Sequence, residues 1–160
     1  MKKIVIMSDN HGDMNILTDI KVLEDDADYY IHCGDSESYQ LRDLDEFVAV
    51  KGNNDWRLSG IPVFQVSRYA SRGLYEGKKV EAMIDFMPEL STEKMLDFLK
   101  KYNGDVLISG HTHMPLVKEK NGLWLINPGS TSWPRGGSKR SYAVMTIDGT
   151  NVDVRIKTLE

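Results

Sequence analysis

The amino-acid sequence predicts an α/β fold in which helices cover the outer faces of mixed β-sheets. Two observations lead to this prediction. In the first part of the chain, short apolar runs typical of buried strands alternate with amphipathic helical segments. In the last part, two turn signals, Asn121-Gly122 and Asp148-Gly149, each separate two strand-like runs. Parallel and antiparallel pairing are therefore both expected, as in an α/β sandwich.

Short apolar runs predict the strands of the first part. Four of them are expected over Ile4–Ser8, Asp28–His32, Phe47–Val50 and Val106–Ser109. The pattern over residues 56–90 is less regular. A strand over Pro62–Arg68 and a loop over Tyr69–Gly77 are expected there.

Two amphipathic segments predict helices. The first starts at about Met14, with Asp13 as its N-cap, and the second spans residues 91–103, with Ser91 as its N-cap and Gly104 after its end. The side chains expected to face the core are Ile16, Leu17, Ile20 and Leu23 in the first helix, and Met95, Leu96, Leu99 and Tyr102 in the second.

Two hairpins are expected at the end of the chain. Their strands are Pro115–Glu119 with Leu123–Ile126, and Ser141–Ile147 with Val152–Thr158. The last strand alternates apolar and charged residues, so one of its faces is expected to contact solvent.

Length and composition limit the class of protein. With 160 residues and 41% hydrophobic types, the chain is expected to form one domain over residues 1–160. The single cysteine, Cys33, excludes an intrachain disulfide framework and a four-cysteine zinc site. The apolar stretch after Lys3 is too short for a signal peptide or a membrane span. We therefore expect a cytoplasmic protein with no membrane partner.

Acidic residues are concentrated in residues 1–60, which contain 13 Asp and Glu against 6 Lys and Arg, whereas residues 61–160 contain 11 against 14. A nucleic-acid-binding surface is expected to be basic, so nucleic acid is not expected as a stable partner. Carboxylates gathered near one site suit cations instead. A solvated acidic surface, as at Glu24-Asp25-Asp26, explains most of the others.

Four of the expected strands end with a small residue or glycine followed by a metal-ligand residue. These residues are Asp9, Asp35, Asn53 and His111. Since ligands of open α/β sheets bind beyond the carboxyl ends of the strands, these side chains would meet at one edge if the strands lie side by side. His11 and His113 each follow two residues after one of them, and an i, i+2 pair in extended chain points the same way.

Six such donors exceed the number that a single zinc ion needs. Mixed Asp, Asn and His donors suit two divalent ions, with manganese expected first and iron, zinc or nickel as alternatives. Two ions that share a carboxylate polarise a phosphoryl group and generate hydroxide, so two-metal phosphoester hydrolysis is the leading reaction class. Each motif alone is also explained by an ordinary turn. His32 and Cys33 are expected to lie in the core.

These residues resemble the calcineurin-like metallophosphoesterases, and within them the small bacterial and archaeal phosphodiesterases. The matching segments span nearly the whole chain in order: Asp9-Asn10-His11, Gly34-Asp35-Ser36-Glu37, Gly52-Asn53-Asn54-Asp55, Gly110-His111-Thr112-His113 and Asn127-Pro128-Gly129-Ser130. The resemblance implies a four-layer α/β/β/α sandwich of two mixed sheets flanked by helices. It implies a first metal held by Asp9, His11, Asp35 and His113, and a second held by Asp35, Asn53 and His111.

Two positions depart from the family pattern. Larger members have a histidine, thought to protonate the leaving group, where this chain has Asn54; small members commonly lack it too. The family also supplies a second-metal histidine from a strand end between the third and fourth motifs, an interval without histidine here. If Lys78-Lys79-Val80 forms the preceding strand, Asp85 or Glu81 would substitute as an oxygen donor. Otherwise the second metal is weakly bound or absent.

Two functions follow from the sequence. In the first, the chain is a phosphodiesterase that uses metal-bound hydroxide, and Asn10 and Asn54 bind the phosphate oxygens of a small phosphate-ester substrate. In the second, it is a catalytically weak or inactive scaffold for protein binding, as the retromer subunit of this fold is. Either function is compatible with a homo-oligomer. The loop Trp133-Pro134-Arg135-Gly136-Gly137 is a candidate wall of the cleft, and Arg68, Arg72 and Lys78 are either phosphate ligands or exposed charges.

Overall fold

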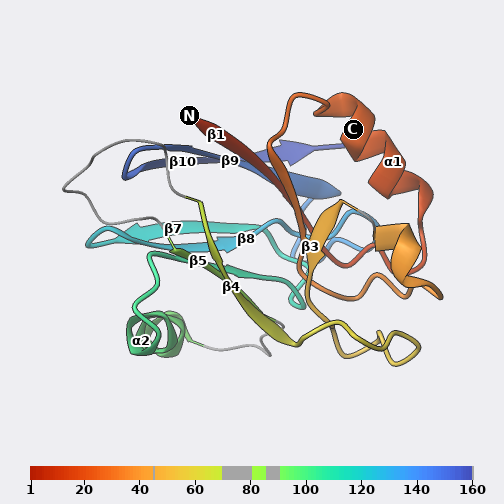
Figure 1. Ribbon diagram of the computed structural model, residues 1–160, viewed down its shortest axis with the longest axis horizontal. Helices are drawn as coiled ribbons and strands as arrows, with labels where there is room; N and C mark the ends of the chain where they lie inside the picture. The colour runs from red at the N-terminus through yellow and green to blue at the C-terminus, as the bar shows by residue number, and fades with distance from the viewer. Residues whose placement is uncertain (45, 70–80, 86–90, 160) are drawn as a thin grey trace.

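The computed structural model describes residues 1–44, 46–69, 81–85 and 91–159, which form two five-stranded sheets (Figure 1). The first sheet has the order β10-β9-β1-β2-β3, with β1 (Lys2–Met7), β2 (Tyr29–His32), β3 (Phe47–Ala49), β9 (Ser141–Asp148) and β10 (Asn151–Thr158). The second has the order β4-β5-β6-β8-β7, with β4 (Phe64–Arg68), β5 (Glu81–Asp85), β6 (Val106–Ser109), β7 (Leu116–Lys120) and β8 (Leu123–Asn127).

Both sheets are mixed. In the first, β1, β2 and β3 run parallel, while β9 is antiparallel to both β1 and β10. In the second, β5, β6 and β8 run parallel, and the edge strands β4 and β7 are antiparallel to their neighbours. The parallel strands of each sheet therefore end at one edge.

The two sheets stack on each other, and one helix covers the outer face of each (Figure 1). Between the sheets, Ile6, Ile84 and Ile108 belong to one buried apolar cluster. Helix α1 (Asn15–Leu23) buries Ile16, Leu17 and Ile20 against the first sheet. Helix α2 (Thr92–Lys101) buries Leu96 and Leu99 against the second. These packing layers confirm the predicted α/β/β/α sandwich.

The apolar runs locate the strands well, and the differences lie mainly at helix ends. Ser91 caps α2 as expected, since its side chain accepts a hydrogen bond from Lys94 N at 3.3 Å. Asp13 does not cap α1: the helix begins at Asn15, after Met14, without a side-chain cap. Leu23, the last residue of α1, is 62% exposed and does not lie in the core as expected.

Tyr102 also differs from its expected place. It follows the end of α2, is 40% exposed, and packs its ring on Phe64 and Phe98 instead of entering the core. In this part of the chain the structure describes the strand β5, Glu81–Asp85. Residues 78–80 and most of the loop expected over residues 69–77 lie outside the described part, as does Arg72.

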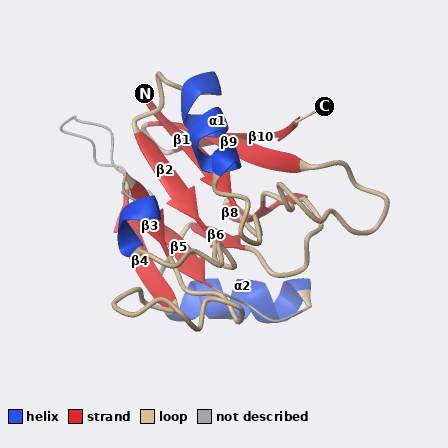
Figure 2. Cartoon of the chain, turned by 90° about the vertical axis from the view of Figure 1, so that its right-hand side faces the viewer, coloured by secondary structure: helices blue, strands red, loops and turns tan. Residues whose placement is uncertain are grey.

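A short 3₁₀ helix, Leu41–Leu44, precedes β3 and completes the regular elements of the described chain. None of the helices described is long and apolar enough to cross a membrane. Figure 1 shows β1 running from the N-terminus toward the right-hand side, and Figure 2, which faces that side, shows loops between α1 and α2. These loops follow the parallel strands.

The first three strand-end motifs belong to one sheet, and the fourth, after β6, belongs to the other. The two edges meet because Gly110 allows close approach: a Cβ there would lie 2.1 Å from Ser8 Oγ and 3.0 Å from Cys33 O. The predicted convergence of strand ends is therefore found across two sheets rather than along one.

Candidate metal centre

Four side chains from three loops meet at this edge. Asp9, His11, Asp35 and His113 each offer a ligand atom, and these atoms all lie within 4.8 Å of one another. Asp9 and His11 follow β1, Asp35 follows β2, and His113 follows β6. None of the four side chains is more than 3% exposed. We refer to these residues as the metal-ligand cluster.

The two histidines of the cluster are oriented by hydrogen bonds on their outer nitrogens. His113 Nδ1 lies 2.7 Å from Trp133 O, and His11 Nδ1 lies 3.1 Å from Glu37 Oε2. Both partners are acceptors, so we assign the ring protons to Nδ1. The two Nε2 atoms, 3.1 Å apart, then face each other with lone pairs. A cation bound by both nitrogens stabilises such a pair, and outer-nitrogen contacts of this kind are usual for metal-binding histidines.

One carboxylate oxygen of Asp9 lies near the two Nε2 atoms and has no hydrogen-bond partner. Its Oδ2 accepts hydrogen bonds from Ser8 Oγ at 2.8 Å and His111 N at 3.0 Å. Its Oδ1 is buried without a hydrogen-bond partner and lies 3.4 Å from His113 Nε2 and 3.9 Å from His11 Nε2. A buried carboxylate oxygen without a partner is costly. A metal ion is the partner that fits this donor set, because Asp oxygen and His nitrogen are common ligands of Zn, Mn and Fe.

Asp35 is held by the third motif. Asn54 donates to it from both the backbone N, at 2.9 Å to Oδ1, and the side-chain Nδ2, at 3.1 Å to Oδ2. The exposed Asn53 side chain also faces this carboxylate, and with its NH₂ turned inward it donates to Oδ2 at 2.9 Å. With its oxygen turned inward, only a cation between the two groups would stabilise the contact.

The pKa values in the metal-ligand cluster are shifted because its ionisable side chains lie close together. The Asp9 carboxylate raises the pKa of His113 despite the opposing effect of burial. Burial raises the pKa of Asp35, the hydrogen bond from Asn54 N opposes that shift, and the charge of Asp9 adds to it. Two carboxylates and two imidazoles crowded in one buried site are an arrangement that a divalent cation would neutralise.

Four left-handed backbone conformations accompany the cluster. The φ angles of Asp9, His11, Asp35 and His113 are 56°, 43°, 54° and 61°. Non-glycine residues adopt this region at a cost, and such strain concentrates at functional sites. The chain therefore adopts an unfavourable local geometry at each of the four residues that converge.

The other expected site residues lie near the cluster, with different roles. His111 is half-buried and contributes its backbone N–H to Asp9. Asn10 is fully buried, and its side chain contacts Asp13 O, Ser36 O and His32 Nε2. The Asn10 amide is thus hydrogen-bonded inside the protein, and its binding of phosphate stays a prediction.

His32 lies in the core, as expected. Burial lowers its pKa to about 4, so it stays neutral, and it accepts a hydrogen bond from Gly34 N at 3.1 Å. Cys33 is also buried. Neither residue is part of the metal-ligand cluster, and His32 supports the loop that carries Asp35 through its contact with Gly34.

Asp55 belongs to the third motif, but no role for it was predicted from the sequence. Its buried carboxylate accepts from the backbone N of Asp35 at 2.8 Å, Gly52 at 2.9 Å and Glu37 at 2.8 Å. It thereby fixes the loops after β2 and β3 to each other. A signal was available in the sequence, since Asp is the residue type that most often satisfies clustered loop N–H groups.

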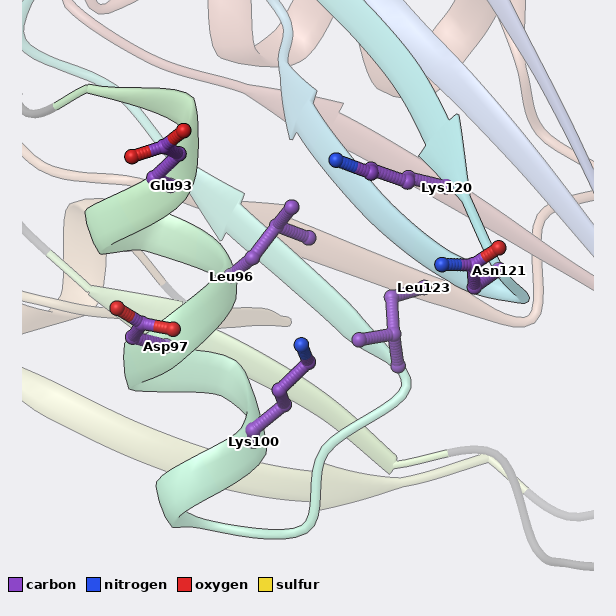
Figure 3. Close-up of a pocket in the computed structure, with 7 residues that line it drawn as sticks. All are labelled: Glu93, Leu96, Asp97, Lys100, Lys120, Asn121 and Leu123. Carbon is purple, nitrogen blue, oxygen red and sulfur yellow. The ribbon is translucent and has the colours of Figure 1, made fainter.

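A hollow of a different kind lies between α2 and the β7–β8 hairpin, on the outer side of the second sheet (Figure 3). Leu96 and Leu123 form its apolar part. Acidic and basic side chains surround them, namely Glu93, Asp97, Lys100 and Lys120. The seven residues that line it include no histidine or cysteine. The donors suited to a transition metal therefore lie at the loop edge, not here.

Residues 1–150 match the family model of the calcineurin-like phosphoesterase superfamily domain. The chain belongs to this superfamily. A probable metallophosphoesterase from Methanothermobacter thermautotrophicus is 32% identical over 140 residues, which are 82% of this chain and 76% of that protein. The probable metallophosphoesterase YsnB from Bacillus subtilis is 28% identical over 156 residues, 95% of this chain and 88% of that protein.

Solved structures support the same assignment. A predicted phosphoesterase from Streptococcus pneumoniae has a TM-score of 0.82 and 26% identity, covering 98% of this chain and 89% of that one. Vps29 from Entamoeba histolytica, solved with Zn²⁺, has a TM-score of 0.73 and 18% identity, covering 98% and 92%. At that identity the second match shows the fold alone. The expected family and fold are thus confirmed.

Proposed function

We propose that this chain is a metal-dependent phosphodiesterase acting on a small phosphodiester. The observation that carries the proposal is the buried meeting of Asp9 Oδ1 with the Nε2 atoms of His11 and His113. Their outer atoms are already hydrogen-bonded, so these three inner atoms are aimed at one ligand. Membership of a metallophosphoesterase family supplies the reaction class.

The cluster would hold a first divalent ion through Asp9, His11, Asp35 and His113. Such an ion acts as a Lewis acid on a phosphoryl group and makes a water molecule more acidic. The protein's own task is to keep the ligands fixed: Trp133 O and Glu37 orient the imidazoles, and Asn54 orients Asp35. Two of the three backbone N–H groups that bind Asp55 lie in the Asp35 loop, which makes this orientation rigid.

Asp35, Asn53 and His111 would hold a second ion. The family's additional ligand comes from a strand end, and β5 is the strand in the corresponding place. The side chains of Asp85 and Glu81 lie outside the described part, but the backbone register distinguishes them. Asp85 pairs with Ser109, two residues before His111, whereas Glu81 begins β5 at the opposite end. From this register we propose Asp85, rather than Glu81, as the replacement ligand.

The expected substrate preference follows from Asn54, which stands where larger members of the family have a histidine. Asn54 is half-buried beside Asp35 and offers an uncharged N–H group to a phosphate oxygen. It cannot donate a proton as an imidazolium does. We therefore expect faster hydrolysis of diesters with good leaving groups, such as aryl diesters, than of alkyl diesters.

The test is hydrolysis of bis(4-nitrophenyl) phosphate by the purified chain after dialysis against Mn²⁺. We expect turnover, and we expect Asp35→Ala to abolish it while circular dichroism shows a folded chain. Asp97→Ala, an exposed carboxylate on α2, is the matched control and retains activity. A folded wild-type chain without turnover under Mn²⁺, Fe²⁺, Zn²⁺ or Ni²⁺ refutes the proposal.

The protein-binding scaffold is the second candidate, favoured by the histidine missing from the second ion's ligands. Metal content per chain separates the two candidates when it is measured beside turnover. A content near two metals with turnover supports the enzyme, and a content near zero without turnover supports the scaffold. Asp85→Ala that lowers the content by one metal identifies the replacement ligand.

A further inference from the structure

Trp133 is an exposed tryptophan in contact with a proposed metal ligand. Its indole stacks on the His11 ring, with centroids 4.4 Å apart and planes 10° apart. The residue is nevertheless 59% exposed. One indole face is thus covered by an imidazole whose Nε2 points to the centre of the cluster, while much of the remaining ring surface contacts solvent.

The backbone around Trp133 is held at several points. Trp133 N donates to Ser130 Oγ at 2.8 Å, and Trp133 O accepts from His113 Nδ1 at 2.7 Å. Arg135 N donates to His113 O at 3.1 Å, and Pro134 between them has a fixed φ. The loop is therefore attached to both histidines of the cluster. An exposed side chain on a rigid loop loses little entropy when a ligand binds to it.

A positive charge lies on the same loop. Arg135 is exposed, and its position in the chain is two residues after Trp133. The loop beside the cluster thus carries both an aromatic surface and a positively charged residue. Together they match a ligand that combines an anionic phosphate with an aromatic group.

We propose that Trp133 is a specificity-determining residue that stacks on the aromatic base or aryl group of the phosphodiester substrate. This inference rests on the proposed function for the identity of the reacting group. Stacking on an exposed aromatic side chain changes affinity by about 5- to 150-fold. The substrate class is therefore an aromatic phosphodiester, such as one that contains a nucleoside.

The first experiment compares two substrates with the same leaving group, bis(4-nitrophenyl) phosphate and methyl 4-nitrophenyl phosphate. The ratio of their kcat/KM values, compared between variants, removes the intrinsic reactivity of each ester. We expect Trp133→Ala to lower the aryl-to-methyl ratio at least 5-fold, mainly through KM, and Trp133→Phe to retain most of it. Trp56→Ala, which removes another exposed tryptophan, is expected to leave the ratio unchanged. An unchanged ratio in Trp133→Ala, or a fall in Trp56→Ala instead, overturns the proposal.

The second experiment does not require turnover. In the Trp56→Phe variant, the remaining tryptophans are Trp133 and the half-buried Trp124. We expect AMP to quench the fluorescence of this variant, with and without Mg²⁺, and ribose 5-phosphate to quench it little. The additional substitution Trp133→Phe should remove the AMP effect.

The two experiments separate failure of this inference from failure of the proposed function. Quenching by AMP in a chain without turnover supports aromatic binding at Trp133 and refutes the phosphodiesterase. Turnover with equal quenching by both phosphates, or with quenching that survives Trp133→Phe, refutes the role of Trp133 and leaves the phosphodiesterase intact.

Discussion

Asp55 should determine both the stability of the loop edge and its affinity for metal. Its Oδ2 accepts from Asp35 N and Gly52 N, and its Oδ1 accepts from Glu37 N and Ser36 Oγ. The carboxylate is almost completely buried. Asp55→Ala therefore leaves three backbone donors without this acceptor.

The magnitude follows from those donors. Each buried N–H that loses its partner costs about 1–3 kcal/mol, and water entering the space left by the side chain compensates in part. We expect Asp55→Ala to lower the free energy of unfolding by about 3–5 kcal/mol. Asp55→Asn should also destabilise, because either orientation of its amide turns an NH₂ toward existing donors. Since Asp35 would lose its support, metal affinity should fall about 10- to 100-fold.

Urea denaturation measures the first effect, and calorimetric titration with Zn²⁺ measures the second. Asp97→Ala serves as the control on exposed helix surface and should change stability by no more than about 0.5 kcal/mol. If Asp55→Ala unfolds at the wild-type urea concentration and binds Zn²⁺ equally well, Asp55 does not hold the two loops, and the reasoning from its hydrogen bonds fails.

Three other perturbations have defined outcomes. Burial alone would raise the pKa of Glu24, but hydrogen bonds from Lys157, Lys3 and Tyr142 lower it to about 2. The ionised Glu24 therefore stabilises the folded chain above pH 4.5, and this contribution is lost as the pH falls toward 2. Acid titration of wild type and Glu24→Gln should show their stability difference shrinking over that range. Gly52→Ala should abolish metal binding as measured by metal content, because its Cβ would lie 2.1 Å from Asp35 Oδ1. A divalent metal at about 100 times its dissociation constant should stabilise the chain by about 2.7 kcal/mol in thermal unfolding, and Asp9→Asn should remove most of this gain.

The strands were predictable because burial of both faces leaves a continuous apolar run, as in Val106–Ser109, whose bounds match β6. The hairpin at Asn121-Gly122 was predictable because its turn needs two positive φ angles, which are 52° and 80° in the structure. The assignment of strands to sheets was not predictable in this way. Nothing in the run Val106–Ser109 indicates that β6 pairs with β5 and β8 instead of with β1, since that choice depends on long-range packing.

The candidate site shows a similar limit. Residue type and position after a strand indicate that Asp9, Asp35 and His113 lie at one edge, because chain geometry dictates it. They do not distinguish an amide that binds substrate from one that binds backbone, because both use the same atoms. Asn10 and Asn54 have the same side chain, but Asn10 is fully buried and donates to two backbone carbonyls, whereas Asn54 is half-buried and donates to Asp35. The contact between Trp133 and His11 joins residues far apart in the chain, so no local pattern indicates it.

Asp9 links the metal-ligand cluster to both sheets. Its N–H donates to Gly34 O at 3.0 Å, its carbonyl accepts from Ser130 Oγ at 2.7 Å, and its Oδ2 accepts from His111 N at 3.0 Å. These partners follow β2, β8 and β6, so the residue connects the first sheet to the second, while Oδ1 faces the two histidines. An ion bound at Oδ1 would therefore stabilise the junction between the sheets as well as the reacting site. Hydrogen exchange at the amides of Asp9 and His111 should then slow on metal binding more than exchange in α2, which lies on the outer face of the second sheet.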